Sequence, residues 1–380
     1  MRSGRGAGLA PRRSIHYTGM LRSPASWAKV ARELLLALIE DGHPVSATEL
    51  VEDRCQLDFP LPAPLEGALG PPRPGGVTFT FSDPADYPAT LEGPPRVGML
   101  VYEATRWPPH WVRLAGEHLE QVVVPSSFCR ETLAASGYPS ENVRVVPHGV
   151  DPKVYHPGDR RPPGSLPELR LLFVGTPARR KGLDILLSAF EAAFSPADEV
   201  SLVIKTFAYA DAESRPYLEQ RWQERARALR RRGFRLEVLT GCLSEAGMAD
   251  LYRSADLICL PSRGEGFALP LLEAMACGTP VLTTGWSGPL DFCDDATGVL
   301  IDDFTPIPGG PMLIDFDHPE RERAMMVEPS VGAVARALSR AAHGRAGLAV
   351  WGENAGRRAR QWTWAAAART LVEGLERAGL

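Results

Sequence analysis

Two carboxylates, Glu265 and Glu273, stand eight residues apart and are the side chains best placed to do chemistry. Glu265 lies on a glycine-containing turn after the short apolar strand 255–262, and Glu273 lies about two turns into an apolar helix that Gly278 ends. Ligands of open α/β sheets bind at the carboxyl ends of strands, where such a loop sits. The spacing predicts one acid at the mouth of a helix and a second along the same wall of a cleft.

The stretch Glu265-Gly-Phe-Ala-Leu-Pro-Leu-Leu-Glu273, followed by Ala274-Met-Ala-Cys-Gly-Thr-Pro-Val281, resembles the donor-sugar motif of retaining glycosyltransferases of the GT-B fold, especially glycosyltransferase family 4. Ala268 stands where that family usually has glycine. The resemblance implies that Glu273 binds the ribose of a nucleotide-diphosphate sugar and that Glu265 contacts the transferred sugar. The backbone that we expect to contact sugar or phosphate comprises Gly266, Phe267, Ala268 and Leu269. The alternative is a plain strand–helix pair with two surface acids.

A second motif, residues 173–182, has a glycine after a strand and three cations at the start of a helix. Backbone N–H groups at a helix N-terminus favour an anion, and Lys181 adds a point charge. The motif resembles the family's diphosphate loop, but Thr176 replaces the usual arginine. Arg179, Arg180 or Lys205 could supply the second cation, and a solvated loop is the alternative for the two arginines. The donor-binding residues expected here are Gly175, Thr176, Arg180, Lys181 and Lys205.

Two further segments support the resemblance. Residues 241–244 are similar to the family's short nucleobase loop, in which Gly241 permits close backbone approach and Leu243 could pack on the base. Residues 125–151 resemble the segment that ends the first domain of the family. We expect His148, in this segment, to be structural rather than catalytic.

The first half of the chain departs from the family where its acceptor should bind. Many members have a catalytic-site histidine near residues 101–107, and this chain has Glu103 instead. Glu103 could hydrogen-bond the donor sugar or bind an acceptor. Trp107 and Trp111 are candidates for an acceptor wall, with core packing as the alternative. Gly19 lies where the family places a glycine loop, although the paired glycines are absent.

Strands alternate with helices along the chain, which predicts parallel sheets covered on both faces. We expect an α/β fold of the GT-B type, with two Rossmann-like domains facing across a cleft and a C-terminal helix that crosses back to the first domain. The expected parts are a disordered tail at 1–14, an acceptor domain at 15–160, a donor domain at 161–355 and the crossing helix at 356–380. Residues 151–167, rich in proline, form the expected linker.

Composition excludes some classes of binding partner. A net charge of −4 gives no basic domain for nucleic acid, and no apolar run is long enough to span a membrane. Six scattered cysteines without a C-x-x-C pair indicate free thiols in a cytoplasmic protein. The expected partners are a nucleotide-sugar donor and a glycan, lipid-linked or small-molecule acceptor, with peripheral membrane association left open.

The resemblance implies transfer of a hexose-type sugar, from a UDP- or GDP-sugar, without a cofactor or metal. Lys181 would stabilise the leaving diphosphate, and Glu265 and Glu103 complete the expected catalytic set. The sequence Asp315-Phe-Asp317 fits a metal motif only in its letters, because it follows the donor helix. A GT-B epimerase or phosphorylase, and a nucleotide-sugar binding protein without transfer activity, remain alternatives.

Overall fold

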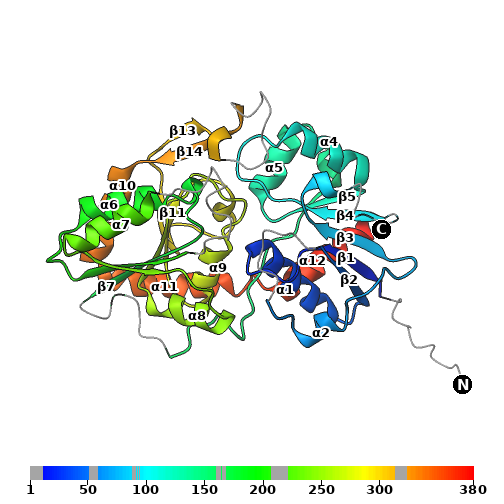
Figure 1. Cartoon of the computed structure of the whole chain (residues 1–380), viewed down its shortest axis with the longest axis horizontal. Helices are drawn as coiled ribbons and strands as arrows, with labels where there is room; N and C mark the ends of the chain where they lie inside the picture. Colours follow the sequence, from blue (N-terminus) through cyan, green and yellow to red (C-terminus); the bar gives the residue numbers. More distant parts are fainter. Residues whose placement is uncertain are drawn as a thin grey trace, which may run out of the picture.

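The structure, a computed structural model, describes residues 12–50, 59–87, 91, 93, 95–159, 164, 168–206, 221–312 and 323–380. Two six-stranded parallel sheets form the cores of two lobes that face each other (Figure 1). The predicted Asp315-Phe-Asp317 and most of the predicted tail lie outside the described residues. The part of the tail that is described includes Arg12, which pairs with Asp41 at 3.0 Å.

The first domain is built on strands that are largely buried on both faces, as expected of parallel strands covered by helices. The sheet order is β2-β1-β3-β4-β5-β6. The strands are β1 (Ile15–Gly19), β2 (Val45–Glu49), β3 (Val77–Phe81), β4 (Arg96–Met99), β5 (Gln121–Val124) and β6 (Val143–Val145). The helices are α1 (Ser26–Glu40), α2 (Ala63–Glu66), α4 (Pro109–His118) and α5 (Ser127–Ala135), with 3-10 turns η1 (Pro84–Asp86) and η2 (Ser140–Asn142).

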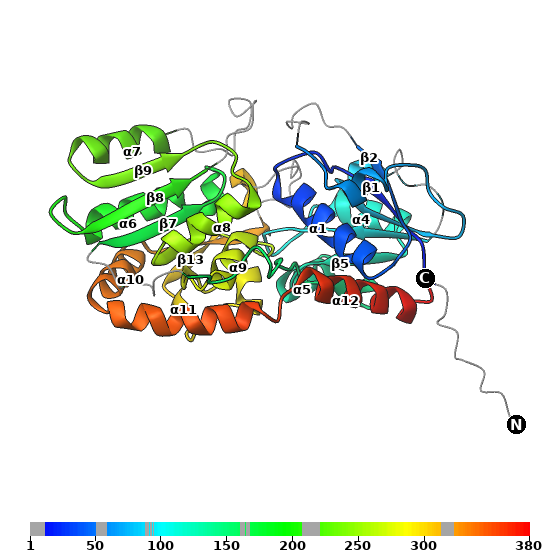
Figure 2. The same ribbon diagram turned by 90° about the horizontal axis from the view of Figure 1, so that it is seen from below.

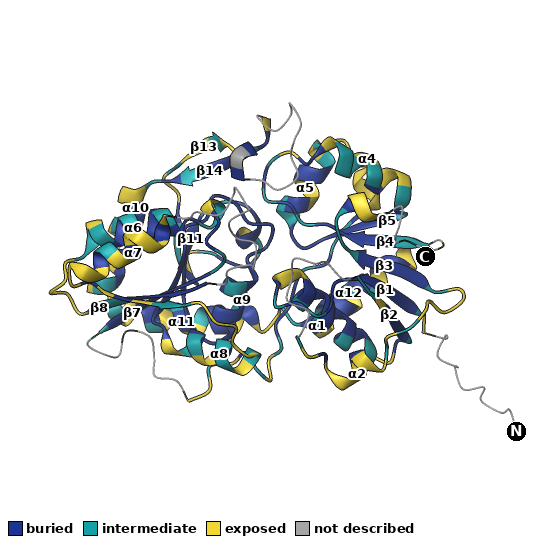
Figure 3. Ribbon diagram, in the orientation of Figure 1, coloured by how far each residue is buried: buried dark blue, intermediate teal, exposed yellow. Residues whose placement is uncertain are grey.

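The second domain repeats this plan with the sheet order β12-β11-β10-β7-β8-β9. Its strands are β7 (Leu169–Val174), β8 (Val200–Lys205), β9 (Arg235–Leu239), β10 (Leu257–Leu260), β11 (Val281–Thr284) and β12 (Gly298–Ile301). Its helices are α6 (Leu183–Ala193), α7 (Trp222–Arg231), α8 (Glu245–Ser254), α9 (Leu269–Ala276), α10 (Val331–His343) and α11 (Arg345–Ala359), with 3-10 turns η3 (Arg179–Lys181), η5 (Gly288–Asp291) and η6 (Gly310–Met312). Both sheets are buried between exposed helix faces (Figure 3).

The chain returns to the first domain through α12 (Trp364–Arg377), which packs against α1. Figure 2 shows α12 continuing beyond α11 and lying along the first domain. The backbone N–H of Val150 donates to the carbonyl of Trp362 at 3.0 Å, so the linker and the returning chain are tied together. The predicted two-domain fold with a crossing C-terminal helix is therefore confirmed. Helix α11 ends at Ala359, and the chain then passes to α12.

An antiparallel hairpin, β13 (Phe304–Pro308) and β14 (Met325–Pro329), extends from the second domain and was not predicted. It reaches the first domain: the backbone N–H of Thr105 donates to the carbonyl of Met325 at 3.0 Å, and Met325 N–H donates to Thr105 Oγ1 at 2.9 Å. Met326 is fully buried in the apolar cluster that includes Tyr102 and Trp107. The hairpin thus closes one side of the space between the domains.

Candidate functional site

The predicted phosphate loop follows β7 and turns sharply into α6. Gly182 has a φ of 72°, and a Cβ added there would lie 1.9 Å from the carbonyl oxygen of Pro261. Only glycine permits both this left-handed conformation and this approach. The turn η3 is therefore held directly against the loop that follows β10, and this contact places Lys181 beside Glu265.

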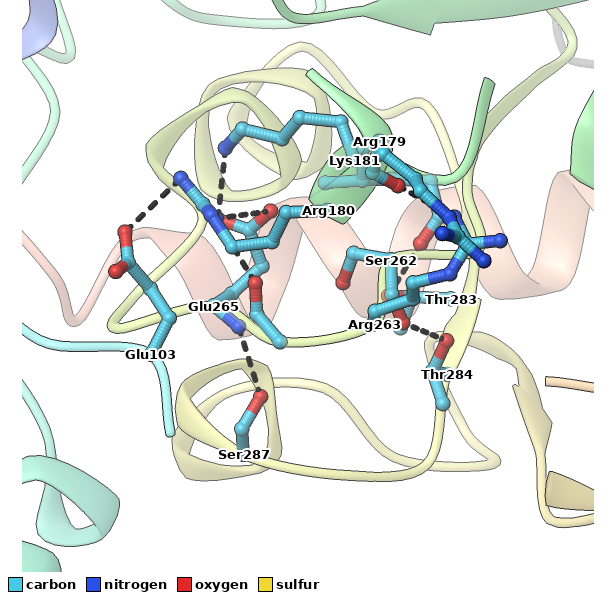
Figure 4. A network of polar contacts seen from close by, with 12 residues as sticks. Glu103, Arg179, Arg180, Lys181, Ser262, Arg263, Glu265, Thr283, Thr284 and Ser287 are labelled. Carbon is cyan, nitrogen blue, oxygen red and sulfur yellow. Dashed lines mark hydrogen bonds and ion pairs between the residues drawn. The ribbon is translucent and has the colours of Figure 1, made fainter. Parts of the chain in front are cut away.

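Four charged side chains meet at the mouth of the second sheet (Figure 4). Lys181 Nζ donates to Glu265 Oε2 at 2.8 Å, and Arg180 Nη1 lies 3.3 Å from Glu265 Oε1. Arg180 Nη2 lies 2.9 Å from Glu103 Oε1, which comes from the first domain. The structure therefore brings together the three predicted catalytic residues, Lys181, Glu265 and Glu103, and places Arg180, a candidate for the second cation, among them.

The charges of this cluster balance, because two cations face two carboxylates in a largely buried place. Burial raises the pKa of Glu103, although Arg180 opposes the shift. Burial lowers the pKa of Lys181, opposed by Glu265. Glu265 Oε1 is buried and receives no hydrogen bond from the described residues, although Arg180 is close enough for an ion pair. That oxygen can accept a hydrogen bond from a hydroxyl of a ligand.

Backbone contacts fix Glu265. Its N–H donates to Ser287 Oγ at 3.1 Å, and its carbonyl accepts the N–H of Gly288 at 3.0 Å. The next residue, Gly266, accepts a hydrogen bond from Ser126 Oγ of the first domain at 2.6 Å. The loop that carries Glu265 is thus held by both domains, and its geometry depends on their closure.

Ala268, at the family's usual glycine position, precedes α9 in a left-handed conformation with φ 73° and ψ 58°. This conformation costs an ordinary L-residue about 1–2 kcal/mol. The surrounding structure therefore imposes the turn even without glycine.

Glu273 lies in α9 and is 5% exposed. Tyr252 donates its hydroxyl to Glu273 Oε2 at 2.7 Å, and Lys29 Nζ from the first domain pairs with Oε1. Sequence reasoning placed Glu273 on the cleft wall but missed both partners. Lys29 lies 244 residues away along the chain, and no local spacing signals such a contact.

The other predicted donor residues lie around this centre. Gly175 and Thr176 follow β7 in the phosphate loop. Lys205 is buried, and its Nζ donates to the carbonyl of Thr206 at 3.2 Å rather than to the cluster. Gly241 and Leu243 lie in the exposed loop before α8, where Leu243 is 41% exposed. This exposure leaves Leu243 free to pack on a ligand.

The candidate acceptor residues separate into two groups. Trp107 is 2% exposed and its Nε1–H donates to Thr132 Oγ1 at 2.9 Å, which favours the core alternative for this ring. Trp111 is half-buried and packs edge-on against Tyr102. Gly19 ends β1 and is buried. Of the first-domain candidates, Glu103 is the one that reaches the charged cluster.

Two residues near the centre are structural. His148 packs between Phe267 and Trp364, with ring centroids 4.8 and 6.0 Å away, and burial lowers its pKa to about 3. It is therefore a neutral spacer, as expected. Arg263, which sequence reasoning missed, is buried and pairs with Asp184 and Glu328, so it ties the hairpin to α6. A buried arginine is not visible in sequence because its neighbours come from three separate segments.

Comparisons with known proteins agree with this geometry. Residues 168–307 match the family model described as Glycosyl transferases group 1. The D-inositol 3-phosphate glycosyltransferase of Segniliparus rotundus is 33% identical over 174 residues, which are 44% of this chain and 37% of that protein. The corresponding protein of Xylanimonas cellulosilytica is 31% identical over 216 residues, 51% of this chain and 49% of that protein. The matches thus span less than half the length of these relatives.

Solved structures match almost the whole chain at low identity. HepE of Anabaena, in complex with UDP and glucose, has a TM-score of 0.69 and 15% identity, over 96% of this chain and 100% of that one. Sucrose-phosphate synthase of Thermosynechococcus elongatus has a TM-score of 0.68 and 19% identity, over 96% and 98%. At these identities the likeness concerns the fold.

Among the described residues, no helix is long and apolar enough to cross a membrane, and no cluster of histidine, cysteine, aspartate and glutamate is suited to a metal ion. The chain has the GT-B fold, and its second domain is similar over residues 168–307 to group 1 glycosyltransferases.

Proposed function

We propose that the protein is a retaining glycosyltransferase of family 4, which transfers a hexose-type sugar from a nucleotide-diphosphate sugar to an acceptor hydroxyl. The observation that carries the proposal is the cluster of Lys181, Arg180 and Glu265 at the carboxyl ends of the second sheet. Two partly buried cations suit a diphosphate, and Glu265 Oε1, which has no hydrogen-bond partner among the described residues, suits a sugar hydroxyl.

In this proposal the same residues bind the donor. The diphosphate lies at Lys181 and Arg180 near the turn into α6, the sugar lies against Glu265 and the start of α9, and the ribose hydroxyls meet Glu273. Leu243 packs on the base. The structural neighbour HepE binds UDP and glucose, which supports a uridine nucleotide, with GDP as the second choice.

In the proposed reaction, the bond between the anomeric carbon and the diphosphate oxygen breaks, and its electron pair leaves with the diphosphate. Lys181 and Arg180 stabilise the developing charge, and such preorganised stabilisation is a large catalytic contribution. The acceptor oxygen forms the new bond on the same face of the sugar, and its proton passes to a phosphate oxygen of the donor. Because the two cations supply the positive charge, we propose that no metal ion is needed.

Donor binding brings a diphosphate of about two negative charges into a cluster that is already neutral. Arg180 then exchanges Glu103 for phosphate, and Glu103 becomes available to the acceptor or to the sugar. Glu103 thus takes a position that many family members give to histidine. The acceptor itself is proposed only by class, as a glycan, a lipid-linked sugar or a small polyol.

Four cysteines in the described residues, Cys129, Cys259, Cys277 and Cys293, are buried free thiols, which supports a cytoplasmic location.

The alternative function is nucleotide-sugar binding without transfer, favoured by the ion pair that ties Glu103 to Arg180. The test is incubation with a panel of UDP- and GDP-sugars, with and without EDTA, while released nucleoside diphosphate is measured. Transfer chemistry predicts slow release that Lys181→Met abolishes and Lys153→Met, on an exposed side chain, preserves. Binding without release would favour the alternative.

A further inference from the structure

Four polar side chains from both domains meet around Glu273. Lys29 Nζ, from α1, contacts Tyr155 Oη at 2.8 Å and pairs with the carboxylates of Glu245 and Glu273. Tyr155, from the linker, donates to Glu245, and Tyr252 donates to Glu273. A single lysine of the first domain therefore lies between two carboxylates of the second.

The cluster closes access to Glu273. The side chain of Glu273 is 6% exposed and that of Lys29 is 13% exposed, and each oxygen of Glu273 already has a protein donor. A ribose that uses this carboxylate must come into the space that Lys29 occupies. Ribose and Lys29 are therefore competitors for one group.

Lys29 has a second partner to which it can move. Glu245 lies at the start of α8 with a side chain 36% exposed, and it already pairs with Lys29. Burial lowers the pKa of Lys29, but Glu273 and Glu245 together outweigh burial and the net shift is upward. The lysine stays charged in either position, so leaving Glu273 does not strand it without a counter-charge.

The domains contact each other at several places, which include the hairpin, the Lys29 cluster and the hydrogen bond from Ser126 Oγ to the carbonyl of Gly266. The β13–β14 hairpin meets the first domain on one side, and α1 meets α8 and α9 on the other (Figure 1). Loss of the Lys29 pair would free the α1 side, while the hairpin contact and the contacts of Ser126 with Gly266 and of Glu103 with Arg180 persist. The α1 side could then open about these remaining contacts.

We propose that Lys29 is an interdomain latch, which holds the empty protein closed by pairing with Glu273 and is displaced toward Glu245 by the ribose of an incoming nucleotide. The inference rests on the proposed function in one respect, that Glu273 receives the ribose. The latch has two consequences: it keeps the empty cleft closed, and it lowers the affinity for the nucleotide.

The test compares the full-length wild type with Lys29→Met, which keeps the length of the side chain and removes its charge. Lys153→Met, whose side chain is 81% exposed, is the matched control. Without nucleotide, small-angle scattering should give a larger radius of gyration for Lys29→Met alone. With nucleoside diphosphates, calorimetry should give a dissociation constant about 5- to 150-fold lower for Lys29→Met, the usual range of coupling between two equilibria.

Glu245→Gln gives a prediction of opposite sign. It removes the second partner, so Lys29 holds Glu273 more firmly and the nucleotide binds more weakly than in the wild type. This variant also serves if Lys29→Met fails to fold. An unchanged radius together with unchanged or weaker binding in Lys29→Met would overturn the latch, as would tighter binding in Glu245→Gln.

The latch and the proposed function fail in different ways. If the wild type binds no nucleoside diphosphate, the proposed function is rejected, and the scattering comparison still decides whether Lys29 holds the domains together. If the wild type binds and Lys29→Met behaves like Lys153→Met in both measurements, the function stands and the latch is rejected.

Discussion

Substitution of Glu273 by glutamine tests the ribose contact through the ligand as well as the protein. Glutamine keeps the shape of the side chain and an oxygen for the hydroxyl of Tyr252, which lies 2.7 Å from Oε2. It loses the negative charge that would hold two ribose hydroxyls. The matching change in the ligand is a nucleoside diphosphate that lacks the 2′- and 3′-hydroxyls.

The expected magnitude follows from the partners of the carboxylate. A carboxylate has about four acceptor positions, and Lys29 and Tyr252 fill two of them. Two ribose hydroxyls would take the position that Lys29 leaves and one that is unfilled, and hydrogen bonds to a charged group contribute about 1.5–3 kcal/mol each. Displacement of Lys29 opposes this gain. A net loss of about 2 kcal/mol, or roughly 30-fold in dissociation constant, is expected for Glu273→Gln.

Calorimetry should show this loss for the ribonucleotide and almost none for the dideoxy analogue, which the wild type should already bind about 30-fold more weakly. Glu199→Gln, an exposed acid of the second domain, is the control and should change neither affinity. Equal affinity of the wild type for both ligands would refute the ribose contact. So would a Glu273→Gln variant that still prefers the ribonucleotide.

Three further predictions concern stability. Burial raises the pKa of Glu33 to about 7 from 4.5, so the stabilisation of its protonated form is complete below pH 4.5 and is lost as the pH rises through 7. In urea denaturation, the free energy of unfolding of Glu33→Gln should therefore exceed that of the wild type by up to about 3 kcal/mol at pH 8 but not at pH 4.5. Equal stability of the two proteins at pH 8 would contradict this. Burial lowers the pKa of His148 to about 3 from 6.5, so its contribution is complete above pH 6.5 and is lost as the pH falls toward 3. Between pH 6.5 and 5 the free energy of unfolding of the wild type should fall by about 2 kcal/mol more than that of His148→Phe. Equal losses in the two proteins would argue against a neutral buried ring. Arg263→Met leaves Asp184 and Glu328 without their partner and should cost about 3 kcal/mol in the same assay; an unchanged midpoint would mean that the hairpin needs no such tie.

Much of the fold was predictable because its signals are local. Apolar strands bounded by turn residues predicted both sheets, and a serine before a helical run, such as Ser244, is a typical N-cap: its Oγ accepts the N–H of Gly247 at 3.1 Å at the start of α8. The hairpin was missed because Pro306 and Pro308 make residues 304–308 unlike a strand. Proline is tolerated there because β13 pairs only with β14 within the described residues.

The contacts of the site that lie within one domain were predictable from the sequence. Lys181 and Glu265 come from neighbouring loops of one sheet, and the strand ends bring them together as expected. The pairing of Glu103 with Arg180, and of Lys29 with Glu273, depends on how two separate domains face each other. No spacing in the sequence encodes that orientation. Trp107 shows the converse, since an aromatic residue beside a functional one is equally suited to the core.

The most direct test of the central claim is the melting temperature of the protein with UDP, GDP, ADP and dTDP, each with and without EDTA. A ligand at 100 times its dissociation constant adds about 2.7 kcal/mol to the stability of the folded protein. The account predicts a clear shift with one nucleotide, UDP or GDP, that EDTA leaves unchanged and that Lys181→Met reduces. A protein whose melting temperature responds to none of the four would contradict the donor site described above.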